Sequence, residues 1–391
     1  MDAAHAPARL STIEMLARLV AFDTTSRNPN GALIGFVRQW LDTHGVPYRL
    51  SGNEAAGKTS IHAVIGPPVA GGIALSGHVD TVPVDGQAWS GDPFTLRREG
   101  GRLIARGACD MKGFVAACLA AVPDLVARRL ARPVHLFITY DEETTCEGAQ
   151  RLIAALPGGP PPPAMCIVGE PSSMHPIVAH KGVTGLRVIA HGKPAHSSRP
   201  LRGVNAIYAA ARAIGWVEAE AARIAREGPF EDGFDPPHTT AHVGTVAGGT
   251  ALNIVPERAE FVMEWRTLPG DDGEVRAAAL KRFIAAEIEP AMRASDPACG
   301  FSYQLYTSLP GMKLPDGHEL ADLMRQLTGS NEVGKVAYGT EGGHYQRAGI
   351  PTIVCGPGDI AQAHTADEWI AESELAAADA FIRRLADRLG T

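Results

Sequence analysis

The sequence has few cysteines, and no single sign of charge dominates it. Its six cysteines among 391 residues form no Cys-x-x-Cys pair, a usage typical of a reducing cytosol. The net charge is −7, and no run of basic residues stands out. Because nucleic acids and anionic membranes attract basic clusters, we expect neither a nucleic-acid partner nor a polybasic membrane anchor.

Long apolar runs are also missing. The longest are far below the roughly 20 residues that a membrane helix needs. Asp2 comes early, and no basic start precedes an apolar core. We therefore expect no membrane span, no secretory signal and a cytoplasmic location. What the sequence does have is 45% hydrophobic residues, enough for a sizeable core, and a length that suggests about two or three domains.

The first stretch that indicates chemistry is 73–83. It begins as a short apolar run typical of a buried strand, stops at Gly77, and then presents His78 and Asp80. Side chains two residues apart in an extended segment point the same way, and open α/β sheets bind ligands beyond the carboxyl ends of their strands. A carboxylate behind a histidine leaves the other ring nitrogen for a metal or a proton. The alternative is a surface histidine beside a turn aspartate.

More acids and a second histidine follow other apolar strands. They are Glu142 and Glu143 after the strand 134–140, Glu170 after 165–168, His364 after 351–355, and Asp110 in the loop before an Ala-rich helix. Because parallel strands end at one edge of a sheet, these side chains can converge. So many carboxylates in one cleft need cations beside them. The alternative is a set of unrelated surface acids, with Asp110 as a helix cap.

Two divalent cations would neutralise such a cluster. The donors are imidazole and carboxylate without thiolate spacing, which suits zinc, cobalt or manganese in a reactive site more than a structural zinc. Hydrolytic sites with two metal ions hold them about 3.5–4 Å apart. Such a pair requires a ligand that bridges both ions, and a loop aspartate such as Asp110 can be that ligand.

The middle of the chain follows a different order of elements. Strand, helix, strand, strand, helix and strand succeed one another, which matches a ferredoxin-like unit. In it we expect a helix over 206–225, an alternating strand over 259–266 and a helix over 274–288. The predicted fold is an α/β domain, with a mixed sheet and helices on both faces, that carries an inserted ferredoxin-like α+β domain. The predicted boundaries are 1–179 and 309–391 for the first domain and 180–308 for the insertion.

Taken together, five segments resemble the metal-site segments of the M20 metallopeptidase/deacylase family. They are 77–83, 107–113, 141–143, 169–171 and 363–364. The likeness runs from the first helix to the last. Within the family, the acetylornithine deacetylase branch is the one that the sequence resembles, at 80–89, 340–341, 356–358 and 362–364. The sequence departs from that branch after Glu341, where Gly342, Gly343 and His344 replace an alanine and an apolar residue.

The resemblance implies a cofactor and a set of ligands. It implies two divalent metal ions, with Zn²⁺ as the first expectation and Co²⁺ as the alternative. His78 and Glu170 would hold one metal ion, and Glu143 and His364 would hold the other. Asp110 would bridge the two.

The resemblance also implies roles beside the metal ions. Asp80 would orient His78, and Glu142 would be the general base. The inserted domain would be a lid and a dimerisation unit, in which His196 reaches the active site of the partner in a homodimer and helps to hold the oxyanion. The residues implied at the substrate are Asn253 and Arg266, which would bind its carboxylate, together with Glu341 and His344. The residues alone also allow an interpretation without function for three of these positions. His196 would then lie in a simple turn, Arg266 would be a solvated residue at the edge of a strand, and His344 would lie in a surface loop.

The implied activity is hydrolysis of an N-acyl amino acid. N2-acetyl-L-ornithine, cleaved to L-ornithine and acetate in arginine biosynthesis, is the first expectation; N-succinyl-diaminopimelate, other N-acyl amino acids and dipeptides are the alternatives. A non-catalytic binding protein predicts a broken ligand set, whereas every ligand type is present. A nucleotide-dependent oxidoreductase is the third hypothesis, because 356–361 formally fit a dinucleotide fingerprint. Against it, Pro357 stiffens that loop and the motif comes near the C-terminus.

Overall fold

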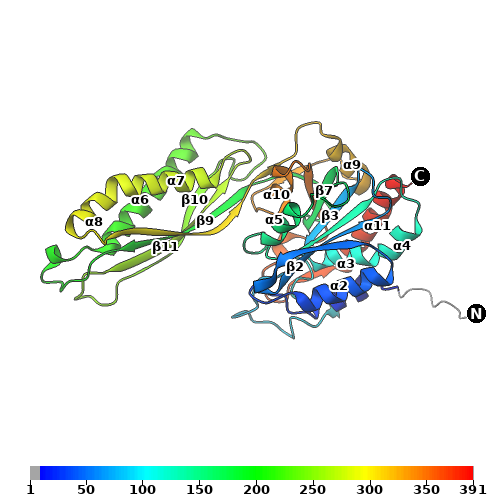
Figure 1. Ribbon diagram of the computed structural model, residues 1–391, viewed down its shortest axis with the longest axis horizontal. Coiled ribbons are helices and arrows are strands. Elements are labelled where there is room, and N and C mark those ends of the chain that lie inside the picture. Colours follow the sequence, from blue (N-terminus) through cyan, green and yellow to red (C-terminus); the bar gives the residue numbers. More distant parts are fainter. Residues whose placement is uncertain (1–8, 391) are drawn as a thin grey trace, which may run out of the picture. The chain divides into compact units, whose positions relative to one another are not determined.

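The computed structural model describes residues 9–390, which form two compact units (Figure 1). The first unit runs to Ala179 and also contains Lys313–Gly334 and the chain from Thr340 onward. The second unit is His180–Met312 together with Lys335–Gly339. Asp2, on which the expectation of no secretory signal rests, lies outside the described residues.

A mixed sheet forms the centre of the first unit. Within residues 9–390 it has nine strands in the order β1-β2-β6-β3-β7-β15-β8-β13, with β14 paired to β8. The neighbours β6, β3, β7 and β15 are parallel, whereas β1 and β2 run antiparallel at one side. The bounds are Tyr48–Asn53 for β1, Lys58–Ile65 for β2, Ile73–His78 for β3, Val134–Thr139 for β6, Met165–Pro171 for β7, Ile177–His180 for β8, Met312–Lys313 for β13, Gly334–Val336 for β14 and Thr352–Gly356 for β15. The parallel strands therefore end at one edge, as predicted.

Helices cover both faces of this sheet, and two neighbouring residues of β3 show why. Successive side chains of a strand point to opposite faces. Gly77 faces helix α3 (Lys112–Ala120) so closely that a Cβ on it would lie 2.8 Å from Val115 Cγ2. Ser76, on the other face, has its hydroxyl 2.8 Å from the hydroxyl of Tyr345 on helix α10 (Gly342–Arg347). The predicted arrangement with helices on both faces is confirmed (Figure 1).

The helices of the first unit begin where local sequence rules place them. For α1, Ser11 and Glu14 form the capping box that their spacing predicts, with Ser11 N donating to Glu14 Oε2 at 2.8 Å. The bounds are Thr12–Val20 for α1, Gly31–Thr43 for α2, Lys112–Ala120 for α3, Val122–Ala127 for α4, Glu147–Ala154 for α5, Glu319–Thr328 for α9, Gly342–Arg347 for α10 and Glu372–Leu389 for α11. A small sheet of β4 (Arg97–Glu99), β5 (Arg102–Ile104) and β16 (Trp369–Ala371) lies in the same unit.

The second unit has the predicted ferredoxin-like architecture. Its strands pair antiparallel in the order β10-β11-β9-β12. Along β11, Phe261, Met263 and Trp265 are buried, which confirms the expected alternation. The bounds are Gly182–His191 for β9, Ala206–Glu227 for α6, Thr240–Gly248 for β10, Arg258–Thr267 for β11, Gly273–Phe283 for α7, Glu289–Ser295 for α8 and Gly300–Leu309 for β12.

The helix predicted over 274–288 is not one regular helix. Helix α7 ends at Phe283, a π-helical turn spans Ile284–Ile288, and α8 follows. Pro290 lies in the first turn of α8. Because proline has no backbone N–H, an α-helical hydrogen bond cannot continue through it, and the chain passes it with a wider turn.

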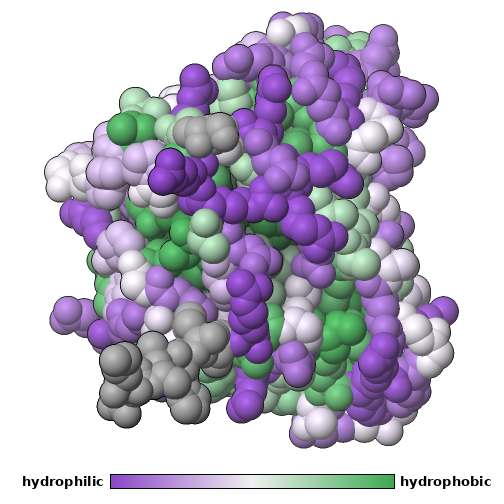
Figure 2. Space-filling model, turned by 90° about the vertical axis from the view of Figure 1, so that its right-hand side faces the viewer, coloured by the Kyte–Doolittle hydropathy of each residue, from purple (hydrophilic) through white to green (hydrophobic). Residues whose placement is uncertain are grey.

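The helices of the described residues include no candidate membrane span. Each helix within residues 9–390 is too short or too polar to cross a bilayer. Figure 2 shows one face of the molecule, on which polar side chains predominate and apolar areas are small and separated. Scattered apolar surface of this kind is ordinary on a folded protein.

Two histidines are buried inside the sheet, and from them we predict how the free energy of unfolding depends on pH. His62 Nε2 on β2 lies 2.9 Å from His135 Nδ1 on β6, and both residues are buried. Burial lowers the pKa of His62 to about 4 and that of His135 to about 3. The unfolded chain takes up protons at these residues below about pH 6.5, whereas the folded chain does not until pH falls to about 4. Stability contributed by the neutral pair is therefore present above pH 6.5 and lost as the pH falls, by about 2 kcal/mol per histidine at pH 5.

The test compares the parent with the double variant His62→Val/His135→Val. We expect thermal unfolding of the parent to shift more between pH 7 and pH 5 than that of the variant, because valine binds no proton in either state. Equal shifts in both proteins would show that these histidines do not control the acid sensitivity.

Candidate metal centre

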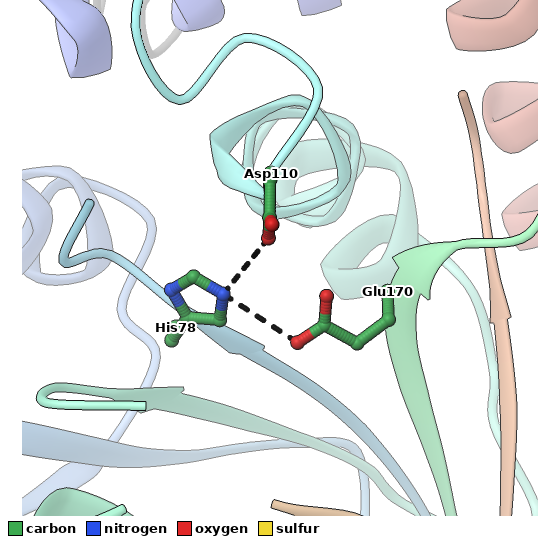
Figure 3. A group of neighbouring side chains, drawn as sticks. All are labelled: His78, Asp110 and Glu170. Carbon is green, nitrogen blue, oxygen red and sulfur yellow. Dashed lines mark hydrogen bonds and ion pairs between the residues drawn. The ribbon is translucent and has the colours of Figure 1, made fainter. Parts of the chain in front are cut away.

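The predicted ligands lie at one edge of the sheet, where the parallel strands end. His78 is the last residue of β3 and is in register with Thr139, the last residue of β6. Glu143 follows β6, Glu170 lies near the end of β7, and Asp110 precedes α3. Figure 3 shows the imidazole of His78 on β3 and the carboxylates of Asp110, before α3, and Glu170, on β7, pointing toward one another.

The donor atoms form two groups that share one carboxylate. The first group is His78, Asp110 and Glu170, and the second is Asp110, Glu143 and His364. His78 Nε2 lies 3.1 Å from Asp110 Oδ1 and 3.5 Å from Glu170 Oε1. His364 Nε2 lies 3.2 Å from Asp110 Oδ2 and 3.1 Å from Glu143 Oε2. Asp110 thus directs one oxygen to each group, which is the geometry that a bridging ligand needs.

The electrostatics of this cluster favour bound positive charge. Burial, with the Asp110 charge nearby, raises the pKa of Glu143 to about 7 and that of Glu170 to about 8. Hydrogen bonds to Asp110 and Glu143 raise the pKa of His364 to about 11. Acids that resist ionisation and an imidazole that holds its proton both indicate a deficit of positive charge, which cations relieve.

The residues fit divalent metal ions by two further observations. Glu170 Oε1 is buried, and its 3.5 Å contact with His78 Nε2 is longer than an ordinary hydrogen bond, which is costly for a carboxylate oxygen unless a cation binds it. The donors are two imidazoles and three carboxylates, a set that suits zinc or cobalt. Cys109, next to Asp110, does not belong to either group. Its Sγ lies 3.5 Å from the carbonyl of Asp359, and burial raises the pKa of its thiol.

Asp80 contacts both His78 and the loop that follows β6. The Nδ1 of His78 lies 3.0 Å from the backbone carbonyl of Asp80, and the carboxylate of Asp80 is farther away at 3.5 Å. That carboxylate accepts hydrogen bonds from Ser26 Oγ at 2.7 Å and from the backbone N–H groups of Glu142 at 3.0 Å and Glu143 at 3.3 Å. Asp80 therefore positions the Glu142–Glu143 loop as well as His78.

Glu142 lies beside the two groups but belongs to neither. Its Oε2 is 4.0 Å from His78 Nε2, and its side chain is 10% exposed. Burial, and then the charge of Glu170, raise the pKa of Glu142 well above its ordinary value. A poorly ionised carboxylate next to a reaction centre suits proton transfer. Its role as the general base stays a prediction.

Three residues implied at the substrate lie in the second unit. His196 is exposed, and its Nδ1 accepts a hydrogen bond from the backbone N–H of Ser198 at 3.1 Å. The backbone carbonyl of Asn253 accepts from Ser197 N at 3.0 Å, so His196 and Asn253 lie on neighbouring turns. Arg266 Nε donates to Glu264 Oε1 at 2.9 Å. The roles of these residues toward a substrate stay predictions.

Glu341 and His344 lie in the first unit. Glu341 is fully buried, and its carboxylate accepts hydrogen bonds from Ser76 Oγ at 2.6 Å and Thr139 Oγ1 at 2.7 Å. His344 is partly buried on α10, and with Gly342 and Gly343 it forms the stretch that departs from the expected sequence. Contact of either side chain with a substrate stays a prediction.

Two charged residues near Asp110 have no motif that singles them out. Arg106 and Glu368 are each 1% exposed and form an ion pair of 2.7 Å. The sequence signal is that each charge adjoins an apolar strand, Arg106 after 103–105 and Glu368 before 369–371. Such a position indicates a buried charge in need of a partner, but it does not say which partner.

Comparison with known proteins decides the family. The model for Peptidase family M20/M25/M40 matches residues 74–388. The chain belongs to this family. The predicted family is thereby confirmed, and the chain is a metallohydrolase that cleaves amide bonds. The acetylornithine deacetylase of Myxococcus xanthus is 35% identical to it over 374 residues, which cover 94% of this chain and 95% of that protein.

Solved structures of low sequence identity share the fold of this M20 chain. The M20 family metallo-carboxypeptidase Sso-CP2 from Sulfolobus solfataricus has a TM-score of 0.75 at 17% identity, over 96% of this chain and 98% of that one. The YXEP protein of Bacillus subtilis, described as a dinuclear metal binding peptidase from the M20 family, has a TM-score of 0.63 at 18% identity, over 96% and 98% of the two chains.

Proposed function

We propose that this M20 enzyme removes the acyl group from an N-acyl amino acid, with N2-acetyl-L-ornithine as its substrate and L-ornithine and acetate as its products. The observation that carries the proposal is the pair of donor groups that share Asp110, with Glu142 beside them. The Myxococcus xanthus relative, matched over nearly its whole length, supports the choice of substrate. We place the reaction in arginine biosynthesis, in the cytoplasm.

The residues of the first unit would divide the chemistry between them. His78 and Glu170 would hold one divalent ion, Glu143 and His364 the other, and Asp110 both. Two bound zinc or cobalt ions supply charge that polarises the amide carbonyl and acidifies water.

Proton transfer falls to one carboxylate of the first unit. Glu142 takes a proton from the attacking water at its carboxylate and returns it to the nitrogen of the leaving amine. The backbone of Glu142 is held by Asp80, which keeps the base next to His78. The oxyanion that forms on the carbonyl needs a donor as well.

We assign that donor role and the binding of the substrate carboxylate to the second unit. His196 is the proposed oxyanion donor and reaches the active site of the partner in a homodimer, whereas Asn253 and Arg266 are the proposed carboxylate ligands. The exposed positions of His196 and Asn253 support such contacts. The second unit would then act both as a lid and as the dimer contact.

A panel of substrates tests the proposed specificity. We expect the metal-loaded enzyme to have its highest kcat/KM with N2-acetyl-L-ornithine, about tenfold or more above N-succinyl-L,L-diaminopimelate, other acetylated amino acids and dipeptides. The reason is that a pocket shaped for one acyl group and one side chain discriminates through the transition state. A higher kcat/KM with the succinyl substrate or with a dipeptide would assign the enzyme to another branch of the family.

A further inference from the structure

The carboxylate of Glu368 is surrounded by backbone N–H groups of the loop that carries Asp110. Its Oε1 accepts from Cys109 N at 2.9 Å and from Asp110 N at 3.0 Å, and its Oε2 accepts from Gly107 N at 3.1 Å. Gly107 has φ +78°, and a Cβ there would lie 2.8 Å from Thr81 Cγ2, so the loop needs glycine at this turn. The loop is thus wrapped around one buried carboxylate.

Arg106 and Gln87 extend this arrangement to the second histidine. Arg106 Nη1 donates to Glu368 Oε2 at 2.7 Å, and Arg106 Nη2 donates to Gln87 Oε1. Gln87 Nε2 in turn donates to the backbone carbonyl of His364 at 2.9 Å. A chain of hydrogen bonds therefore runs from the backbone of Asp110 to the backbone of His364, two residues that share the second donor group.

We propose that Glu368 is a positioning residue of the metal centre, which acts with Arg106 and Gln87 to hold Asp110, the residue shared by both donor groups, in place relative to His364 of the second group. This inference rests on the proposed two-metal function. The side chain of Glu368 supplies no donor atom to either group, and it contacts Asp110 through the backbone N–H of that residue. We name the three residues Gln87, Arg106 and Glu368 the positioning network.

A purely stabilising role explains the geometry less well. A buried ion pair by itself is replaceable by apolar residues of similar volume with little loss of stability. Here the carboxylate also accepts hydrogen bonds from three backbone N–H groups of one short loop, so an apolar side chain would leave these donors without an acceptor. His364 has φ +59°, an unfavourable conformation for a residue with a side chain, and the hydrogen bond from Gln87 is one contact that holds it.

Zinc titration of the full-length protein, first stripped with a chelator, tests the proposal. Glu368→Gln keeps the size of the side chain but turns an N–H₂ group toward N–H donors. We expect it to weaken zinc binding at both sites about 10- to 100-fold. Gln87→Ala leaves the contacts of Glu368 with the Asp110 loop in place. We therefore expect it to lower the zinc affinity of the donor group that contains His364 and to leave the affinity of the group that contains His78 unchanged. Excess zinc should restore kcat in Gln87→Ala, which a general loss of stability would not allow.

Glu372→Gln is the matched control. Glu372 lies four residues after Glu368 and forms an exposed ion pair with Arg98 at 2.6 Å, so the same change of charge leaves the Asp110 loop intact. It should bind zinc as the parent does. If Glu368→Gln fails to fold, the zinc titration of Gln87→Ala still tests the proposal.

Parent-like zinc affinity in either positioning variant, measured on folded protein, would overturn the proposal. A parent protein that binds fewer than two equivalents would instead overturn the proposed two-metal function, and with it this inference. The two failures are therefore distinguishable in one titration series.

Discussion

Glu142→Ala should lower kcat at least about 100-fold while the protein keeps both metal ions. The side chain of Glu142 lies next to His78 but outside both donor groups, so its removal takes away no ligand. It removes the carboxylate that we assign to proton transfer, an effect of about 10²- to 10⁴-fold on kcat. Steady-state kinetics on N2-acetyl-L-ornithine, with metal analysis of the same sample, measure both halves of this prediction.

Glu147→Gln is the control for that variant. Glu147 is on α5, close in sequence, and forms an ion pair with Arg151 at 2.7 Å on the surface. The Glu147→Gln substitution should leave kcat unchanged. If Glu142→Ala retained near-parent turnover, another group would have to be the base. If it lost its metal, Glu142 would have to be counted among the ligands.

Asp110→Ala should remove both metal ions, whereas loss of any other ligand should remove one. Only Asp110 directs an oxygen to each donor group in the described part of the chain. Without it each group keeps two donors, too few for tight binding of zinc. Elemental analysis after gel filtration should give two equivalents for the parent, about one for His364→Ala, and close to none for Asp110→Ala.

Cys109→Ala provides the comparison for the Asp110 loop. It changes the adjacent residue, whose thiol belongs to neither donor group, and should retain two equivalents. The same metal loss in Asp110→Ala and His364→Ala would mean that Asp110 serves a single ion, and the bridging role would be wrong.

Much of the fold could be predicted because local rules and strand patterns agree. The capping box at Ser11 and Glu14 begins α1, and alternation identifies the buried side of β11. Apolar runs that end in acids or histidines indicate the strands whose carboxyl ends meet, and the parallel pairing of β3 with β6 and β7 brings those ends together.

Other features of the site depend on contacts between distant segments, which spacing does not encode. The sequence predicts a carboxylate behind His78, whereas the nearer acceptor is the backbone carbonyl of Asp80. Glu368 and Arg106 are far apart in sequence and meet only when β16 pairs with β5. The π-helical turn before Pro290 likewise follows from packing and from a missing N–H group rather than from periodicity.

Anomalous diffraction at the zinc edge, from crystals of the zinc-loaded enzyme, tests the central claim most directly. The account predicts two peaks, one among His78, Asp110 and Glu170 and one among Asp110, Glu143 and His364, with Asp110 between them. A single peak, or peaks bound by other side chains, would contradict it.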